Sequence, residues 1–237
     1  MNLTLAKQTG STTDGSSFAT TAFTPTAGDL LVVIVASSGT TDPSSVSDTG
    51  QGFTWTKVTS CVKNTSADTM YMFVPSGLAA AVSTTITWSC GATTATGAFI
   101  TVIAITGMAA TGLSAVRQSA VQNNATAAST PTVTLGQSIN SANPLIGAVF
   151  NASSPATMTP PTGWTEFNDA GYTTPTTGME TVGLVSGGSG TTVTWGNTST
   201  ASGAIVAEFA APVVATSTSS PGGLALVQRP LNHLIQL

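Results

Sequence analysis

The chain has 237 residues, of which 41% are hydrophobic and only 6% charged, with five Lys or Arg against nine Asp or Glu and a net charge of −4. This hydrophobic content is enough for a real core, so the low charge does not indicate disorder. Five scattered cations cannot supply the clustered charge that nucleic acids or anionic membranes require, so we expect neither partner. Thr and Val favour strands, and Gly, Asn, Ser and Pro favour turns, which predicts an all-β protein.

Seven strands are predicted in the first half of the chain, because short runs of β-branched or alternating residues lie between turn residues. The most apolar of them, Leu30–Ala36, reads as a central strand with both faces covered. Thr40–Gly52 is predicted to be a loop, since Pro, Asp and Gly punctuate it. The predicted strands are Leu3–Gln8, Phe18–Phe23, Leu30–Ala36, Phe53–Val58, Met70–Val74, Thr84–Trp88 and Ala98–Ile105.

The second half begins with two linking strands on either side of an Asn-, Ala-, Ser- and Thr-rich segment, Asn123–Thr130. The five strands that follow repeat the order of the first half. The predicted strands are Leu113–Gln122, Thr132–Leu135, Asn143–Ser153, a strand that begins at Gly163–Thr165, Met179–Val185, Thr191–Trp195 and Ala204–Ala210.

An internal repeat relates the two halves. Trp88 and Trp195 each end a Thr–Thr–x–Thr–Trp sequence and are 107 residues apart, while Trp55 and Trp164 are 109 apart. Two long repeats indicate pseudo-symmetric halves, about 18–107 and 132–211, and not a solenoid. We predict one antiparallel β-sandwich domain over 1–211, jelly-roll-like, with two separate small sandwiches as the alternative.

The composition changes after Pro212. A Ser/Thr linker, Val213–Ser220, and a break at Pro221–Gly223 precede an apolar tail. We expect residues 212–237 to form an extended tail that docks onto a neighbouring subunit, by strand addition. The predicted docking residues are Leu224, Leu226, Val227, Arg229, Leu231, His233, Leu234 and Ile235.

No group of residues predicts a catalytic site. The sole histidine, His233, lies in the tail, where a base is not held rigidly beside a nucleophile. Paired carboxylates could still hydrolyse glycosides, but the spacing of the acidic residues forces no two of them together. We therefore expect no enzyme, no cofactor and no metal. The acidic candidates considered are Asp29, Asp42, Asp48, Asp68, Glu166, Asp169, Glu180 and Glu208.

Two further residue types leave alternatives open. Cys61 and Cys90 could form a disulfide or remain two buried thiols. The four Trp could form a sugar-stacking platform, but their equivalent positions in the two halves favour packing roles.

The N-terminus has no cationic segment followed by an apolar one, so no signal peptide is expected. Apolar runs of eight to ten residues are too short to span a bilayer.

Four segments together resemble a recurrent β-sandwich module of phage virion proteins and bacterial surface proteins. They are Ala27–Val33, Val46–Trp55, Tyr71–Val74 and Thr84–Thr87. The likeness covers about residues 18–211 and brings no catalytic residues with it.

The resemblance implies a non-enzymatic structural protein of a phage particle, foremost a capsid decoration or head-surface protein that docks on neighbouring subunits. A tail or fibre component, and a carbohydrate-binding or adhesive surface module, are the alternatives. The expected partners are the major capsid protein or further copies of this chain, in a homo-oligomer or symmetric assembly, with a glycan as the alternative ligand. The expected location is the virion, assembled in the host cytoplasm, or otherwise the extracellular space or cell surface.

Overall fold

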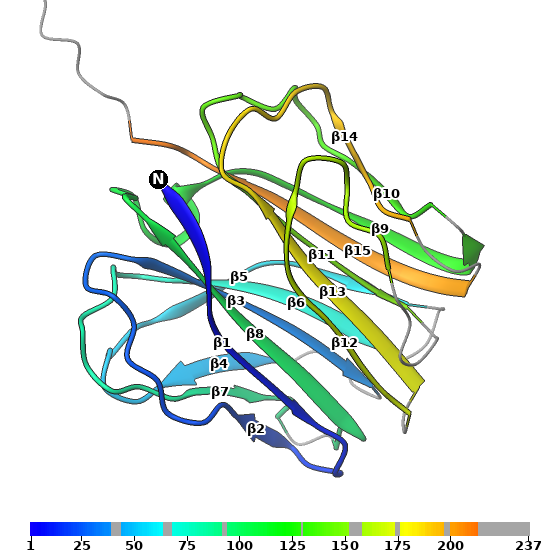
Figure 1. The fold of residues 1–237 in the computed structure, drawn as a ribbon. Helices are drawn as coiled ribbons and strands as arrows, with labels where there is room; N and C mark the ends of the chain where they lie inside the picture. Colours follow the sequence, from blue (N-terminus) through cyan, green and yellow to red (C-terminus); the bar gives the residue numbers. More distant parts are fainter. Residues whose placement is uncertain are drawn as a thin grey trace, which may run out of the picture.

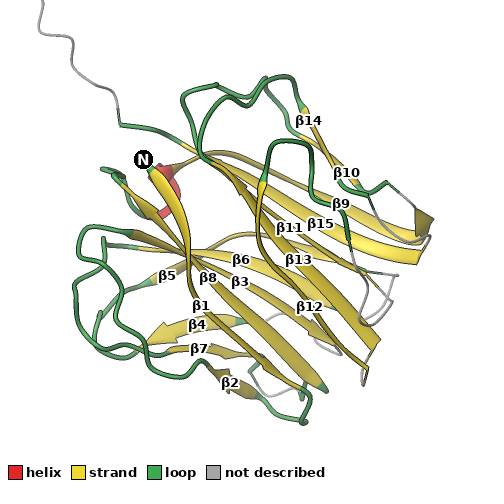
Figure 2. Cartoon of the chain, in the orientation of Figure 1, coloured by secondary structure: helices red, strands yellow, loops and turns green. Residues whose placement is uncertain are grey.

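The computed structural model describes residues 1–38, 44–63, 68–91, 94–128, 130–151, 158–173, 176–196 and 200–212. Every regular element in these ranges is a strand except for one short 3₁₀ helix, η1, at Gly112–Ala115 (Figures 1 and 2). All strand pairs are antiparallel, which confirms the predicted all-β antiparallel class.

The first half forms two sheets. A five-stranded sheet has the order β1-β8-β3-β6-β5, and a three-stranded sheet has the order β2-β7-β4. The strands are β1 Asn2–Ser11, β2 Ser17–Ala19, β3 Leu30–Ser38, β4 Ser45–Asp48, β5 Trp55–Val62, β6 Thr69–Pro75, β7 Ile86–Ser89 and β8 Gly97–Thr106.

The second half repeats this arrangement with one strand fewer. Its large sheet has the order β9-β15-β11-β13-β12 and its small sheet is β10-β14. Each strand takes the place of its counterpart in the first half, with β9 in the position of β1. The strands are β9 Val116–Ala128, β10 Thr132–Thr134, β11 Leu145–Asn151, β12 Thr165–Thr173, β13 Thr176–Leu184, β14 Thr192–Thr194 and β15 Thr200–Phe209.

Three apolar cores hold four layers of sheet together. In each half, one face of the large sheet packs against the small sheet, around Trp88 in the first half and Trp195 in the second. The opposite faces of the two large sheets share a third core, to which Ile34 contributes from β3 and Phe150 from β11. Each half is therefore a sandwich of its own, and the two are joined through a common core.

Two local predictions were wrong. The predicted loop Thr40–Gly52 contains β4, whose short Ser–Val–Ser–Asp sequence gave little sign of a strand. The segment Asn123–Thr130 does not separate two linking strands, because β9 runs on through it to Ala128 and pairs with β15 along its length. That pairing supplies the edge of the second large sheet.

A buried lysine connects the halves. Lys63, 2% exposed at the end of β5, donates from Nζ to the backbone oxygen of Asn151 at 3.2 Å and to Thr177 Oγ1 at 3.1 Å. Burial lowers the pKa of Lys63, and the nearby Asp68 carboxylate, 3.3 Å away, acts in the opposite direction. The lysine thus ties β5 of one half to β11 and β13 of the other.

Candidate functional site: the open edge of the second small sheet

The two small sheets differ at one edge. In the first half, β7 lies between β2 and β4, and Thr87 pairs with Ser47 of β4. In the second half the described residues place only β10 beside β14, followed by a single bridge between Thr159 and Gly196. The strand that would correspond to β4 thus begins at Thr159 and goes no further.

Proline explains why this strand stops. Continuing the bridge by two residues would place Pro161 opposite Thr194, the position that Ser47 holds opposite Thr87. Proline has no N–H to donate to a ladder, and Pro160 precedes it, so pairing cannot continue along β14. The sequence Pro160–Pro161 is the local cause of the open edge.

The backbone of β14 shows which groups are left at this edge. Trp195 N donates to Pro131 O at 2.9 Å, and Leu135 N donates to Thr191 O at 2.8 Å, so these odd-numbered residues bond toward β10. In an antiparallel strand the groups of alternate residues point the other way. The N–H and C=O groups of Thr192 and Thr194 therefore face away from β10.

A groove runs along this edge, with a volume of about 370 Å³. Its apolar side is formed by Ile139, Trp164 and Leu184, and its floor by the edge of β14. Trp164 is half-buried and packs against Gly147, where a Cβ would lie 3.4 Å from the indole. This volume falls in the range of about 300–1,000 Å³ typical of ligand sites.

In the first half, a closed turn after β4 occupies the place that corresponds to the groove. Asp48, at the end of β4, accepts hydrogen bonds from the N–H groups of Gln51 and Gly52 at 3.0 and 2.8 Å. Its second oxygen accepts from Trp55 Nε1 at 2.8 Å. Trp55, the counterpart of Trp164, is thus tied to a closed turn, and Asp48 is a turn-forming residue. Only the second half is open here.

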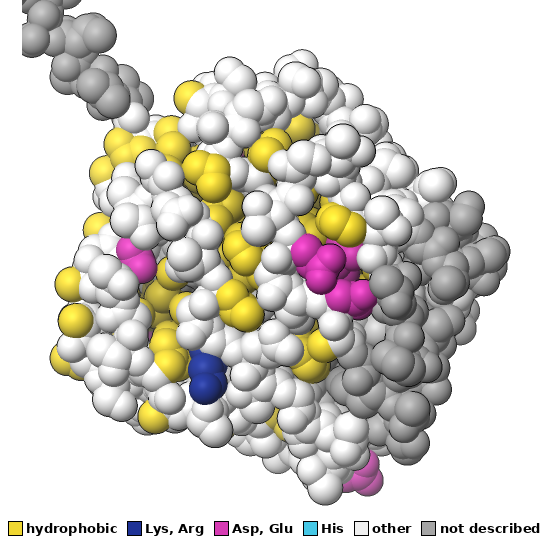
Figure 3. All heavy atoms as spheres, in the orientation of Figure 1, with side chains coloured by type: hydrophobic (Ala, Val, Ile, Leu, Met, Phe, Trp, Pro, Cys, Tyr) yellow, Lys and Arg dark blue, Asp and Glu magenta, His cyan; other side chains and the backbone are white. Residues whose placement is uncertain are grey.

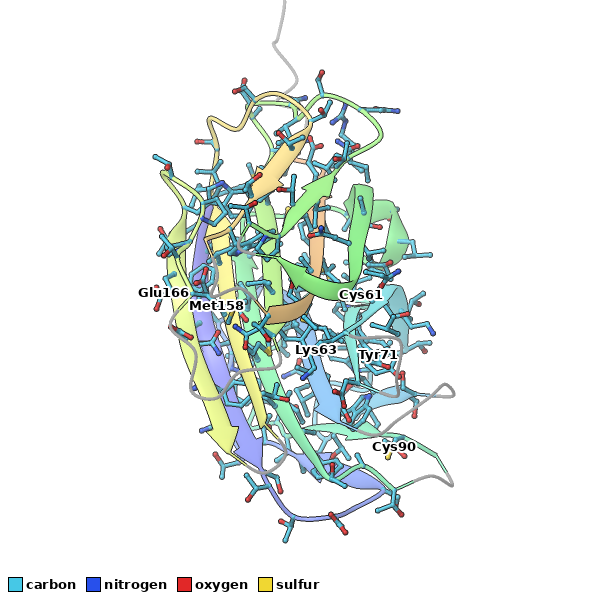
Figure 4. All side chains as sticks on the ribbon, turned by 90° about the vertical axis from the view of Figure 1, so that its right-hand side faces the viewer. Cys61, Lys63, Tyr71, Cys90, Met158 and Glu166 are labelled. Atoms are coloured by element: carbon cyan, nitrogen blue, oxygen red, sulfur yellow. The ribbon has the colours of Figure 1, made fainter. Side chains whose placement is uncertain are left out.

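A second feature is a cluster of carboxylates on β12 and β13. Asp169 lies directly opposite Glu180 in the pairing of these strands, and Glu166 acts electrostatically on both. Asp169 also accepts a hydrogen bond from Met158 N at 3.3 Å. Figure 3 shows acidic side chains gathered on one face of the molecule, and Figure 4 shows Glu166 and Met158 on the same side, apart from Lys63 and Tyr71.

Glu180 is the buried member of this cluster, with no exposed surface. Neither of its carboxyl oxygens has a hydrogen-bond partner among the described residues. Burial, then the charges of Glu166 and Asp169, raise its pKa from 4.5 to about 8, while the Trp195 indole acts in the opposite direction. Glu180 is therefore mainly protonated at neutral pH. The pKa of Asp169 is also raised, chiefly by burial.

This cluster was not predicted, because Glu166 and Asp169 are three residues apart and simple alternation would put them on opposite faces. The register of β12 shifts between Glu166 and Asn168, so Phe167 is an extra residue. Phe167 packs against the central core and Asn168 reaches Thr101 of the other large sheet, which leaves Glu166 and Asp169 on the same outer face.

Glu208 is not part of this cluster and has a structural role. It accepts hydrogen bonds from Arg117 at 2.6 Å, from Asn140 N at 2.9 Å and from Asn143 Nδ2 at 2.7 Å, and also from Gln118. Burial alone would raise its pKa, but these donors outweigh burial and hold the pKa below its ordinary value.

Of the remaining acidic candidates, Asp29 is buried beside β3 with one oxygen unpartnered, Asp68 pairs with Lys63, and Asp42 lies outside the described residues.

Asn143 fixes the point where the chain leaves the domain. While its Nδ2 donates to Glu208, its Oδ1 accepts from Ala211 N at 2.9 Å. Ala210 N also donates to Ala115 O at 2.8 Å. The described chain then ends at Pro212, so all eight predicted docking residues, from Leu224 to Ile235, lie outside the described residues.

Burial assigns packing roles to two of the four Trp and to both Cys. Trp88 and Trp195 are fully buried packing residues, whereas Trp164 borders the groove. Cys61 lies in the central core and Cys90 in the core of the first half, and both are free thiols. Burial raises the pKa of Cys61 far above its ordinary range.

The described residues contain no set of three or more His, Cys, Asp or Glu arranged to hold a metal, and no helix that could cross a membrane.

No family model matches the chain, and comparison with curated proteins and with solved structures likewise gives no match.

Proposed function

We propose that this protein is a non-enzymatic structural component of a phage particle, foremost a capsid decoration or head-surface protein in a symmetric assembly. The observation that supports the proposal most strongly is a double sandwich with very few charged residues. Only 6% of the residues are charged, and the face in Figure 3 consists mainly of neutral polar and hydrophobic side chains. Such a surface favours association, which suits a protein whose surface is covered by neighbours.

The resemblance of residues 18–211 to β-sandwich modules of phage virion proteins and bacterial surface proteins supports the same proposal. A location in the virion after assembly in the host cytoplasm follows from it. A tail or fibre position would use the same fold and the same kind of contact.

Removing residues 213–237 tests the proposal. The variant should keep the two sandwiches, because the last residues held by the domain are Ala210 and Ala211. It should also fail to enter particles when it is expressed during phage assembly. Absence of the full-length protein from assembled particles would contradict the proposal, whereas normal incorporation of the folded, truncated protein would contradict only docking through the tail.

The carboxylate cluster supports a non-enzymatic role. Two of its members, Asp169 and Glu180, are cross-strand neighbours, and a glycosidase needs two carboxyl groups that both reach the substrate. However, Glu180 has no exposed surface, so a substrate cannot reach it in this conformation.

A glycan-binding role is the second candidate, and Trp164 in the groove is the observation that favours it. An aromatic face beside the hydroxyls of Thr192 and Thr194 is suited to a sugar ring. Glycan binding that is lost in Trp164→Ala, with an unchanged melting temperature, would support this role. The matched variant Trp55→Ala should not affect such binding, because Trp55 is held in a closed turn by Asp48.

A further inference from the structure

We propose that the groove beside β14 binds the segment Leu224–Gln228 of a second copy of this chain, which adds as a strand to the open edge. The inference rests on the proposed function, and it identifies where the tail of one subunit docks on the next.

The edge of β14 offers the hydrogen bonds that an added strand needs. The N–H and C=O groups of Thr192 and Thr194 point toward the groove, and both side chains are exposed. In the first half, the equivalent groups are used by an ordinary strand: Thr87 pairs with Ser47, and Thr85 O accepts from Thr49 N at 3.1 Å. The fold has thus already accepted a strand of four residues, β4, at this position in the other half.

One side of the groove suits the leucines of the proposed segment, while the rest of its exposed lining is mainly polar and includes Thr162 and Ser189. Ile139, Trp164 and Leu184 present apolar surface to one side of an added strand, and Gly187 and Gly188 have no side chain to block it. No charged residue lines the groove. An uncharged segment with alternate leucines can bury these against the apolar side while its backbone pairs with β14.

Leu224–Gln228 is the segment of the chain that fits this description. Its sequence, Leu–Ala–Leu–Val–Gln, carries no charge and contains no proline, while Pro221 precedes it and Pro230 follows it. A strand added here is therefore limited to a few residues, as β4 is in the first half. Leu224 and Leu226 lie on the same face of such a strand, because side chains alternate.

The chain also leaves the domain near the groove. Ala211 is bonded to Asn143, four residues from Ile139 in the groove wall. Residues 213–223 supply a linker that spans at most about 40 Å when fully extended. A tail that enters the groove of the next subunit makes a head-to-tail contact, which builds rings or filaments. A tail bound to its own chain would build no assembly, so the proposal commits to a second copy.

Cysteine cross-linking of the full-length chain tests this arrangement. One variant carries Thr194→Cys and another carries Ala225→Cys, whose side chain lies on the same exposed face as Thr194 when Leu224 and Leu226 face the core. The native Cys61 and Cys90 are buried and do not compete. Mixing the two under mild oxidation should give a disulfide-linked dimer. Thr87→Cys replaces Thr194→Cys in the matched control, which should give none, since β4 covers that edge.

Two outcomes of the cross-linking would overturn the proposal. One is the absence of a dimer in the mixture. The other is a link that forms only within a single chain carrying both Thr194→Cys and Ala225→Cys, which would place the tail on its own domain.

A second measurement separates this proposal from the proposed function. Thr194→Lys should abolish incorporation into particles, because a lysine on an exposed edge opposes strand addition, whereas Thr87→Lys should not. If Thr194→Lys assembles normally while deletion of residues 213–237 does not, the tail docks elsewhere, and only this inference fails. If the deletion assembles normally, the tail is not needed for assembly and this inference fails, whereas the proposed function fails if the full-length protein does not enter particles.

A glycan is the competing occupant of the groove. Binding of a glycan that is lost in Trp164→Ala, together with no cross-linking through Thr194→Cys, would assign the groove to glycan recognition and overturn the proposal.

Discussion

Glu180 occupies the position in the second half that Tyr71 occupies in the first. Tyr71 lies opposite Val35 and packs beside Trp88, with ring centroids 5.9 Å apart. Glu180 lies opposite Val149, and the nearby Trp195 indole acts to lower the pKa of the Glu180 carboxyl. The neighbours have changed as well: Lys57 Nζ is 5.8 Å from the centre of the Tyr71 ring, whereas the residue equivalent to Lys57 is Glu166. The tyrosine and lysine that pack together in the first half are therefore replaced by carboxyl groups at the equivalent positions of the second half.

This carboxyl cluster should make stability depend on pH. Below about pH 4.5, Glu180 is protonated in both the folded and the unfolded chain. As the pH rises from 4.5 to about 8, the unfolded chain ionises first, so Glu180 lowers the free energy of unfolding progressively. Glu180→Gln should remove most of this slope, and the variant should be more stable than the wild type above pH 8. Urea unfolding between pH 4 and 9 measures both effects.

Glu166→Gln is the control for this experiment. Its side chain is exposed, and it acts on Glu180 only through its charge. It should therefore weaken the pH dependence without removing it. A Glu180→Gln variant with the pH dependence of the wild type would contradict the assignment.

Glu208→Ala should destabilise the second half. The substitution leaves Arg117, Asn143 and two further donors without their acceptor. Removing one partner of a buried ion pair lowers the free energy of unfolding by about 3–5 kcal/mol. Because Arg117 is partly exposed, we expect a loss at the lower end of this range. Chemical denaturation measures the loss. Amide exchange at Ala211 should also become faster, because Asn143 holds both Glu208 and Ala211. Unchanged exchange at Ala211 would show that Asn143 keeps its position without Glu208.

Gly203→Ala should destabilise the central core. An added Cβ would lie 2.6 Å from a ring carbon of Phe150 and 2.8 Å from the backbone oxygen of Val62. Overpacking of this kind costs about 1–3 kcal/mol. Gly136→Ala is the matched control, because nothing lies within 4 Å of the added atom, and it should leave the melting temperature unchanged or slightly higher. Equal melting temperatures for the two variants would contradict this view of the packing.

Phe150→Ala should show that the two sandwiches unfold together. Phe150 is fully buried in the core that both large sheets share. Its truncation should cost about 3–5 kcal/mol. Because neither large sheet can expose this face to water alone, calorimetry should still give one transition, at a lower temperature. Two resolved transitions in the wild type would contradict a shared core.

The sequence predicted most of the strands, because apolar runs such as Leu30–Ala36 and the repeated Thr–Thr–x–Thr–Trp carry strong local signals. It did not predict β4, because Ser45–Asp48 is a polar segment that becomes a strand only through pairing with β7. The strand number of the first half was therefore underestimated, seven strands against the eight observed, and the small sheet of each half was not predicted.

The open edge could have been found from the sequence only by aligning the two halves residue by residue. Pro160–Pro161 is visible as a break, but its meaning depends on Thr159 facing Gly196. The carboxyl cluster depends in the same way on the extra residue Phe167, which no alternation pattern indicates. Both features are matters of strand register, which is set by contacts far apart in the chain.

The irregular strands of the two large sheets have a consequence for association. The register shifts lie in the pairings of the four outermost strands, β1, β5, β9 and β12, and none interrupts the pairings among the inner strands. A bulged edge strand is a poor template for another sheet, so these irregularities guard the molecule against amyloid-like stacking at the rims of its large sheets. The protein has almost no charge that could keep its copies apart by electrostatic repulsion. The bulged edge strands provide this protection instead.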